Sequence, residues 1–258
     1  MDSSVKFSKK TPSGHKLLHL DTVDSTNNFL EGLIQKEKLT DGTIAMADFQ
    51  SSGKGMLNNT WTSEKSKNLL FSMLFRPKSL QVSQQFYLSK TISLGISDYL
   101  LEFFPLEEVK IKWPNDIFVS TSKISGILIK CAVRNESVLH AVIGTGLNVN
   151  QTSFPIDFNA TSLKLLTGNF MSPENVLNNL IEKLDLRFEM MKSGAFKAID
   201  SDYHSRLLGF NSWLKYAQNG QTFEGKIVEV GEDGRVLLEK RDGSTGLFEV
   251  KEIALISM

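Results

Sequence analysis

The distribution of hydrophobic and polar positions along the chain predicts a mixture of strands and helices. Apolar or alternating runs predict strands over residues 16–21, 42–50, 68–75, 109–113, 123–133 and 138–148. Apolar residues at helical spacing predict helices after the capping segment 24–27, over 83–104, from 173 to about 192, and over 195–208. The strands between residues 109 and 148 mostly follow one another closely, which favours antiparallel neighbours over a doubly wound parallel sheet. The pattern therefore predicts an α+β fold with a mixed, largely antiparallel sheet.

A different pattern begins near residue 209. From Trp213 onward, apolar and polar residues alternate, and tight turns are indicated at Asn219-Gly220, Asp233-Gly234 and Asp242-Gly243. This pattern predicts a small SH3-like β-barrel, so that the chain divides into a main domain of residues 1–209 and a C-terminal domain of residues 210–258. The polar segment 1–14, rich in Ser and Lys, is expected to be a frayed lead-in.

Composition and charge exclude several classes of function. The 29 basic and 29 acidic residues cancel, whereas a general nucleic-acid binder normally carries a basic excess, so DNA binding is not expected. The longest apolar runs, such as 68–75, are far shorter than the roughly 20 residues that span a bilayer, so no membrane partner is expected. Cys131 is the only cysteine, which fits a reducing compartment and predicts a cytoplasmic location. The four histidines are scattered, so no metal site is predicted.

The residues that could carry chemistry lie at strand ends. Gly53-Lys54-Gly55 follows a predicted strand, and its glycines would let the backbone approach an anion. Trp113-Pro114 ends another strand, because proline fixes its own φ and restricts the residue before it. Lys112, Asn115 and Asp116 could converge at that end. Each pattern taken alone is equally compatible with an ordinary surface turn.

Two further segments contain glycine inside strongly β-forming sequence. Gly126 follows Lys123 in KISGIL, and Asn148 ends a segment that contains Gly144 and Gly146. A glycine in such a position often marks the close approach of a ligand or of another backbone. A solvated lysine at a strand start is the alternative for Lys123.

The order of these segments resembles one family. DSTN (24–27), QSSGKG (50–55) with Trp61, KWPND (112–116), KISGIL (123–128) and GTGLNVN (144–150) follow one another as in the biotin protein ligases, also called biotin–[acetyl-CoA-carboxylase] ligases. The resemblance covers about residues 17–170, and the tail is similar to the small C-terminal barrel of that family. It implies an enzyme that forms biotinyl-5′-AMP from biotin and ATP, with Mg²⁺ as counter-ion. The biotinyl group then passes to a lysine of a biotin carboxyl carrier protein of a carboxylase.

The resemblance also implies roles for individual residues. The catalytic residues would be Lys123, Lys112 and Asp116. Biotin would be bound by Ser25, Thr26, Asn27, Gln50, Gly53, Lys54, Gly55, Met56, Lys123 and Gly126. The nucleotide would be bound by Lys54, Trp61, Lys112, Asn115 and Asn148.

The sequence departs from the family in two places. The loop that commonly reads GRGRxG has Met56 and Asn58 instead of a second cation and a third glycine, so its closed contacts are open to question. About sixteen residues precede the first predicted strand, which is too few for the DNA-binding domain of some members. A homodimer could form by extension of the sheet near residues 123–149. The alternatives are a lipoate or octanoate ligase or transferase of the same superfamily, or a biotin-binding module without activity.

Overall fold

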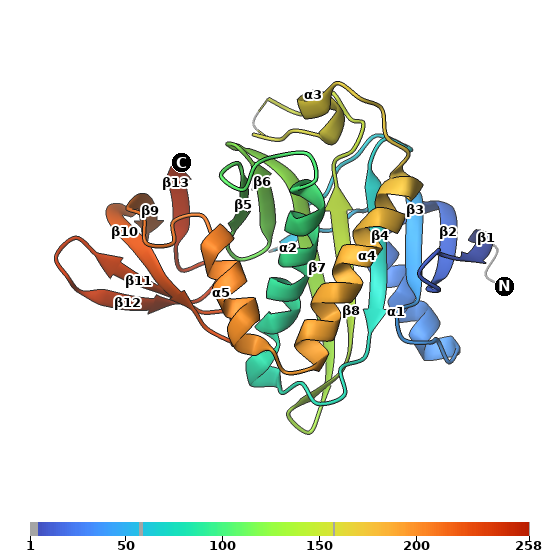
Figure 1. Ribbon diagram of the computed structural model, residues 1–258, viewed down its shortest axis with the longest axis horizontal. Coiled ribbons are helices and arrows are strands. Elements are labelled where there is room, and N and C mark those ends of the chain that lie inside the picture. Colours follow the sequence, from blue (N-terminus) through green and yellow to red (C-terminus); the bar gives the residue numbers. More distant parts are fainter. Residues whose placement is uncertain (1–4, 57–58, 157, 258) are drawn as a thin grey trace.

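The computed structural model describes residues 5–56, 59–156 and 158–257 and contains two β-sheets (Figure 1). The larger sheet has eight strands in the order β1-β2-β3-β4-β8-β7-β6-β5. Their bounds are β1 (Val5–Lys10), β2 (Lys16–Val23), β3 (Ile44–Gln50), β4 (Leu69–Phe75), β5 (Val109–Lys112), β6 (Asp116–Val119), β7 (Ser122–Arg134) and β8 (Ser137–Leu147). Only β2 and β3 pair in parallel, because α1 (Thr26–Lys36) forms the crossover between them. The predicted mixed, largely antiparallel sheet is confirmed.

Helices cover both faces of this sheet and explain its most apolar strand. The helices α2 (Phe86–Leu100), α4 (Pro173–Lys192) and α5 (Phe196–Arg206) lie on one face, and α1 lies on the other. In β4, Phe71 and Met73 join the larger core beneath α2 and α4, whereas Leu74 joins the smaller core beneath α1. All residues of β4 are therefore buried, as expected of a strand that is covered on both faces. Among the described residues, no helix is long and apolar enough to cross a membrane.

The second sheet comprises β9 (Leu214–Gln218), β10 (Gln221–Val230), β11 (Val236–Lys240), β12 (Thr245–Phe248) and β13 (Ala254–Ser257). Its strand order is β12-β11-β10-β9-β13, and every pairing is antiparallel. The predicted turn at Asn219-Gly220 joins β9 to β10, and both residues have positive φ. Within the described part of the chain β12 and β13 do not pair, so this sheet is open and the expected closure into a barrel is wrong. The division at residue 209/210 stays a prediction.

Side chains of the helices hold the second sheet through the backbone of Val230. Lys90, which is 1% exposed, donates from Nζ to the Val230 carbonyl at 2.7 Å and pairs with Asp200 at 2.6 Å. The Val230 N–H donates to Nε2 of His204 at 3.0 Å. Burial and the nearby Lys90 ammonium lower the pKa of His204, which keeps this ring neutral and able to accept. The two sheets are thus joined by polar contacts as well as by apolar packing.

Three elements of the structure are not predicted by the hydrophobic pattern. The strand β1 lies where a frayed lead-in is predicted, and that prediction is wrong from Val5 to Lys10. It is an edge strand with mostly exposed residues, so it lacks the alternation of a half-buried strand. The short strand β6 follows the KWPND turn directly, and α3 (Leu163–Thr167) is a single turn capped by Ser162. β1 and α3 bury little apolar surface, whereas β6 buries Ile117, Phe118 and Val119 but is only four residues long, too short for a periodic signal.

Candidate functional site

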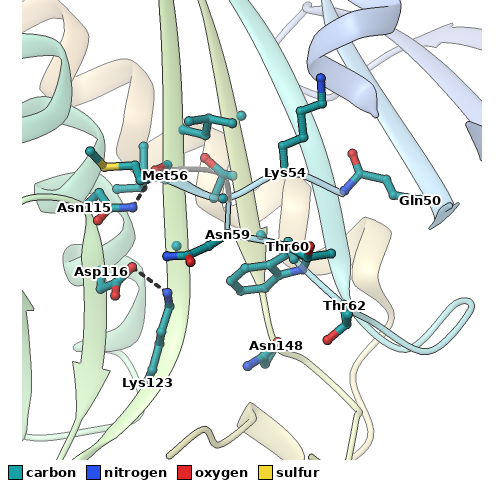
Figure 2. Close-up of a pocket in the computed structure, with 18 of the residues that line it drawn as sticks. Gln50, Lys54, Met56, Asn59, Thr60, Thr62, Asn115, Asp116, Lys123 and Asn148 are labelled. Carbon is teal, nitrogen blue, oxygen red and sulfur yellow. Dashed lines mark hydrogen bonds and ion pairs between the residues drawn. The ribbon is translucent and has the colours of Figure 1, made fainter. Parts of the chain in front are cut away.

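A cavity of about 680 Å³ opens on the α1 face of the large sheet. Its walls are the start of α1, the loop residues 54–56 and 59–62, the strands β6 to β8, and residues 154–155, 158 and 160. Figure 2 draws 18 of the lining residues, ten of them labelled, from these separate parts of the chain. Cavities of this size accommodate small molecules and cofactors.

One end of the cavity is formed by Ser25, Thr26, Asn27 and Gln50, and is called the amide end below. The Gln50 Oε1 atom accepts hydrogen bonds from the Thr26 backbone N–H at 2.7 Å and from its hydroxyl at 3.1 Å. Gln50 therefore satisfies one of the first N–H groups of α1, which have no partner inside the helix. Ser25, within the predicted capping segment 24–27, occupies the N-cap position, but its side chain makes no capping bond. The amide end is thus built by contact between α1 and the end of β3.

Asn27 packs closely against the strands β7 and β8. Its Nδ2 donates to the carbonyl of Leu128 at 3.1 Å, and it is 3% exposed. A Cβ atom at Gly144 would lie 2.4 Å from Asn27 Oδ1, so only glycine allows this approach. The glycine of the GTGLN segment therefore serves the packing of α1 on β8.

The indole of Trp61 covers two other glycines of the strands. A Cβ atom at Gly146 would lie 2.5 Å from its Cε2 atom, and one at Gly126 would lie 3.0 Å from its Cζ3 atom. Its Nε1–H is buried and has no hydrogen-bond partner among the described residues. Because an unpaired buried donor is costly, this N–H group is available to a ligand.

Asp116 and Lys123 form the other end of the cavity, called the ion-pair end below. Lys123 Nζ and Asp116 Oδ1 lie 2.6 Å apart, and the Lys123 ammonium lies 5.7 Å from the centre of the Trp61 ring. Their approach lacks the angle of a hydrogen bond, so Asp116 Oδ1 is buried and accepts none from the described residues. Asp116 is the only acidic side chain among the described lining residues, and Lys123 and Lys54 are the basic ones.

The turn before Asp116 is fastened to β7. Asn115 Nδ2 donates to the Ile127 carbonyl at 2.9 Å, and the Ile127 N–H donates to the Asn115 carbonyl at 3.0 Å. These two bonds continue the pairing of β6 with β7, in which Asp116 lies opposite Gly126. Figure 2 shows Asn115, Asp116 and Lys123 on neighbouring strands at the same side of the cavity.

Asn148 and Thr145 come from the end of β8. Asn148 Nδ2 donates to the Thr161 carbonyl at 2.9 Å, so its orientation is set by the chain that follows. Thr145 is 4% exposed, and its hydroxyl has no partner among the described residues. Its side chain lies on the opposite face of β8 from Gly144 and Gly146, beside Phe71 and Ile127 of the larger core, so this hydroxyl points away from the cavity.

The loop after β3 folds back on itself beside the cavity. The Gly55 N–H donates to the Asn59 carbonyl at 2.7 Å, and the Asn59 N–H donates to the Met56 carbonyl at 3.0 Å. Lys54 is exposed, and Figure 2 shows its side chain directed away from Asp116 and Lys123. Asn58, which replaces the third glycine of the family's loop, lies outside the described residues.

The structure brings most of the predicted site residues into this one cavity. They are Ser25, Thr26, Asn27, Gln50, Lys54, Gly55, Met56, Trp61, Asn115, Asp116, Lys123, Gly126 and Asn148. Gly53 does not line it and instead packs closely against the loop backbone. A Cβ atom there would lie 2.4 Å from the Trp61 carbonyl. Lys112 does not line it either, and its Nζ lies 5.3 Å from the centre of the Phe118 ring. Their functional roles remain predictions.

Several lining residues were not predicted. Thr145 lies inside GTGLN, so the glycines on either side of it were an available signal. Phe154, Pro155 and Phe158 belong to a segment without periodicity, and Val250 comes from the second sheet's region of the chain. These four residues reach the cavity only through the tertiary fold, so no local pattern could identify them.

Comparison with known proteins places the chain among ligases. Residues 20–148, half of the 258-residue chain, match the profile of the biotin/lipoate A/B protein ligase family. The bifunctional ligase/repressor BirA of Bacillus spizizenii is 28% identical over 253 residues, which cover 96% of this chain and 77% of that protein. The biotin–[acetyl-CoA-carboxylase] ligase of Mycobacterium tuberculosis is 27% identical over 202 residues, covering 77% of this chain and 74% of the other.

A solved structure agrees with this placement. The biotin protein ligase from Aquifex aeolicus in complex with biotin and ATP superposes with a TM-score of 0.73 and 26% identity. The match covers 94% of this chain and 99% of the Aquifex chain, so it includes both sheets.

Proposed function

This chain belongs to the biotin/lipoate A/B protein ligase family, and we propose that it is an ATP-dependent biotin protein ligase that works through a biotinyl-5′-AMP intermediate. The observation that carries the proposal is one cavity that joins the amide end to the ion pair of Asp116 and Lys123. Between the two ends lies the Trp61 indole, whose buried Nε1–H has no partner among the described residues. Buried polar atoms are nearly always paired in proteins, so a partner supplied by a ligand accounts for this donor.

The amide end suits the ureido ring of biotin. A ureido group offers two N–H donors and one carbonyl acceptor, and the amide end carries hydroxyls and carboxamides from Ser25, Asn27 and Gln50. The indole of Trp61 supplies apolar surface for the rest of the ring system. This end is rigid, because Gln50 is tied to α1 and Asn27 is tied to β7.

The ion-pair end suits the reacting carboxylate and phosphate. In the first step, a biotin carboxylate oxygen attacks the α-phosphorus of ATP. The new C–O–P bond forms as the bond to the β-phosphate breaks, and pyrophosphate leaves. Lys123 would stabilise the negative charge that gathers on the α-phosphate, since preorganised donors act most strongly in a site that excludes water. In the second step, a carrier lysine amine attacks the acyl carbon, an amide forms, and AMP and a proton are released.

Mg²⁺ would accompany ATP as its counter-ion. The buried Asp116 Oδ1, which lacks a hydrogen bond from the described residues, is the hard oxygen ligand that Mg²⁺ prefers. Asp116 would hold the ion together with phosphate oxygens, and the ion would neutralise phosphate charge. Asn115 and Asn148 would border the nucleotide, and both are already oriented by bonds to backbone carbonyls.

Exchange of labelled pyrophosphate into ATP tests the first step directly. We expect exchange by the full chain that requires biotin and is not supported by lipoate. Exchange with lipoate instead of biotin would identify the lipoate branch of the family. Biotin binding without exchange would identify a binding module without activity.

Transfer is tested with a carboxyl carrier domain as acceptor. The carrier should gain the mass of one biotinyl group in the presence of biotin and ATP, and substitution of its target lysine by arginine should abolish the gain. If the carrier stays unmodified while exchange proceeds, the adenylation step would still be supported, but the proposed acceptor would be refuted. The homodimer and the cytoplasmic location stay predictions; residues 128–134 of β7, which pair only with β8, offer an edge for a second copy.

A further inference from the structure

Trp113 stands between the ion-pair end and the second sheet. Its indole Nε1–H donates to the carbonyl of Gly234 at 2.9 Å, and its ring packs against the larger core. Trp113 does not line the cavity, but Pro114, Asn115 and Asp116, the next three residues of the chain, all do. One hydrogen bond thus joins the second sheet to the turn that carries Asp116.

The acceptor of this bond is held in place. Gly234 lies in the turn between β10 and β11 with a φ of +92°, and a Cβ there would lie 2.6 Å from Phe86 Cδ2. The Phe86 N–H donates to the Glu232 carbonyl at 3.1 Å. The turn therefore packs against the start of α2, and this packing fixes the Gly234 carbonyl relative to the main domain.

The turn from Trp113 to Asp116 is consequently fastened at two points. Asn115 is bound to Ile127 of β7 by the two hydrogen bonds described above, and Trp113 is bound to the second sheet. Asp116 follows at once and forms the ion pair with Lys123. The amide end depends on α1, β3 and β7, so it has no comparable link to Gly234.

We propose that Trp113 is a positioning residue, through which the second sheet holds Asp116 and Lys123 in place for the reaction of ATP. The inference rests on the proposed biotin ligase function and deepens it. The second sheet then takes part in adenylation without lining the cavity itself. Among the described residues after Gly209, only Val250 lines the cavity, and it lies in the short connection before β13. Small displacements of reacting groups lower rates while leaving distant binding contacts intact.

The test is Trp113→Phe, which keeps an aromatic ring and removes the N–H donor. We expect kcat/KM for ATP in biotin-dependent pyrophosphate exchange to fall about three- to tenfold, the effect of one neutral hydrogen bond. The biotin Kd, measured by calorimetry without ATP, should change less than twofold. The matched control is Trp213→Phe, since Trp213 contacts Lys226 and Arg241 at the surface of the second sheet. It should leave both quantities unchanged.

A second variant separates positioning from general stability. In Gly234→Ala the new methyl group would meet Phe86 at a position of positive φ, so the turn must shift and its contact with Trp113 is disturbed. We expect the same loss in kcat/KM for ATP, and no further loss when it is combined with Trp113→Phe, because both break one contact. If Trp113→Phe does not fold, Gly234→Ala alone carries the same test.

The outcomes are distinct. Wild-type rates in Trp113→Phe, an equal loss of biotin affinity, or independent losses that multiply in the double variant would overturn the positioning role. Absence of biotin-dependent exchange in the wild type would overturn the proposed function and this inference with it. A loss confined to ATP kinetics and shared by both single variants would support the inference.

Discussion

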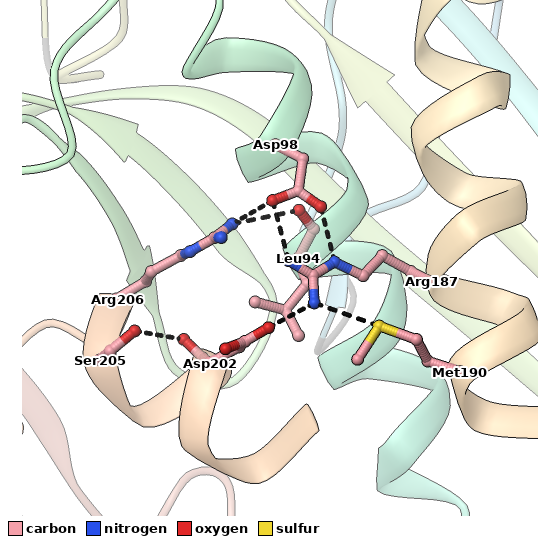
Figure 3. A network of polar contacts seen from close by, with 7 residues as sticks. All are labelled: Leu94, Asp98, Arg187, Met190, Asp202, Ser205 and Arg206. Atoms are coloured by element: carbon pink, nitrogen blue, oxygen red, sulfur yellow. Dashed lines mark hydrogen bonds and ion pairs between the residues drawn. The ribbon is translucent and has the colours of Figure 1, made fainter. Parts of the chain in front are cut away.

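Two groups of charged residues on opposite faces of the large sheet differ in how completely their polar atoms are hydrogen-bonded. The first is the helix clamp, formed by Asp98, Arg187, Asp202 and Arg206 between α2, α4 and α5 (Figure 3). Arg187 donates to both oxygens of Asp98, at 2.6 and 3.0 Å, and Arg206 donates to it at 2.7 Å. The second is the ion-pair end of the cavity, where Asp116 Oδ1 accepts no hydrogen bond from the described residues.

The difference reflects what each group does. Burial alone would raise the pKa of Asp98, but hydrogen bonds from Arg187 and Arg206 outweigh it and lower the pKa. The clamp therefore stabilises the packing of three helices without any ligand. At the ion-pair end Asp116 has one cationic partner among the described residues, Lys123, and beside it the buried Trp61 N–H is left for a ligand to satisfy. Substitutions in the clamp should alter stability, whereas substitutions in the cavity should alter binding and rate.

The largest expected effect is that of Lys123→Ala on adenylation. Removal of one preorganised donor from the site of developing charge typically costs about 2.7–4 kcal/mol, or roughly a hundred- to thousandfold in rate. Biotin-dependent pyrophosphate exchange should fall by that factor, while the urea midpoint stays close to that of the wild type. Lys110→Ala is the matched control, because Lys110 lies outside the cavity lining on β5. A folded Lys123→Ala protein with wild-type exchange would refute the role of Lys123.

Arg187→Met should show the opposite behaviour. It removes the charged donor shared by Asp98 and Asp202, and hydrogen bonds to charged groups contribute about 1.5–3 kcal/mol each. The free energy of unfolding, measured in urea, should fall by roughly that amount, with little change in exchange kinetics at 25 °C. Lys192→Met on the same helix is the control, since exposed ion pairs contribute at most about 1 kcal/mol. Loss of exchange without loss of stability would contradict the assignment of the clamp to stability and of the cavity to binding and rate.

Two buried threonines sharpen the comparison of paired and unpaired polar groups at a smaller scale. The Thr145 hydroxyl has no partner among the described residues and lies on the core face of β8, whereas the Thr43 hydroxyl donates to the Thr40 carbonyl at 2.8 Å. Thr145→Val should leave stability unchanged or raised and leave ligand binding unchanged, because it removes an unpaired buried hydroxyl. Thr43→Val should lower stability by about 0.5–1.5 kcal/mol and leave binding unchanged. Calorimetry and urea unfolding of both variants check this, and a loss of ligand binding in Thr145→Val would show that its hydroxyl reaches the cavity.

The smallest expected effect is the response of the clamp to acid. The pKa of Asp98 is lower in the folded chain than the ordinary value of 3.8, so the folded state holds this charge to lower pH than the unfolded state. Its contribution to stability is fully present above about pH 5 and is lost as the pH falls through the lowered pKa. Unfolding in urea at several pH values below 5 should show a shallower acid decline for Arg187→Met than for the wild type. Parallel declines would indicate that Asp98 is not coupled to Arg187.

The helices and most strands could be read from periodicity because each buries one continuous apolar face. The N-cap position of α1 at Ser25 was predictable, but the atom that satisfies Thr26 belongs to Gln50, which lies 24 residues further on. Local rules favour a cap from a neighbouring side chain, and only the packing of α1 against β3 supplies this one. Lys112 shows a second limit: the resemblance assigns it to the site, whereas its ammonium lies over Phe118 and outside the cavity lining, so its role stays a prediction.

The sequence by itself determined the fold class, the turn positions of the second sheet and the segments from which the cavity is built. Those properties depend on residues close together in the chain, where periodicity, glycine and proline act directly. Only the tertiary structure decided that the second sheet stays open among the described residues, that Val250 and Phe158 reach the cavity, and that Trp113 is bonded to Gly234. Trp113 and Gly234 lie 121 residues apart in the chain, and no local pattern encodes which distant surface a side chain will meet.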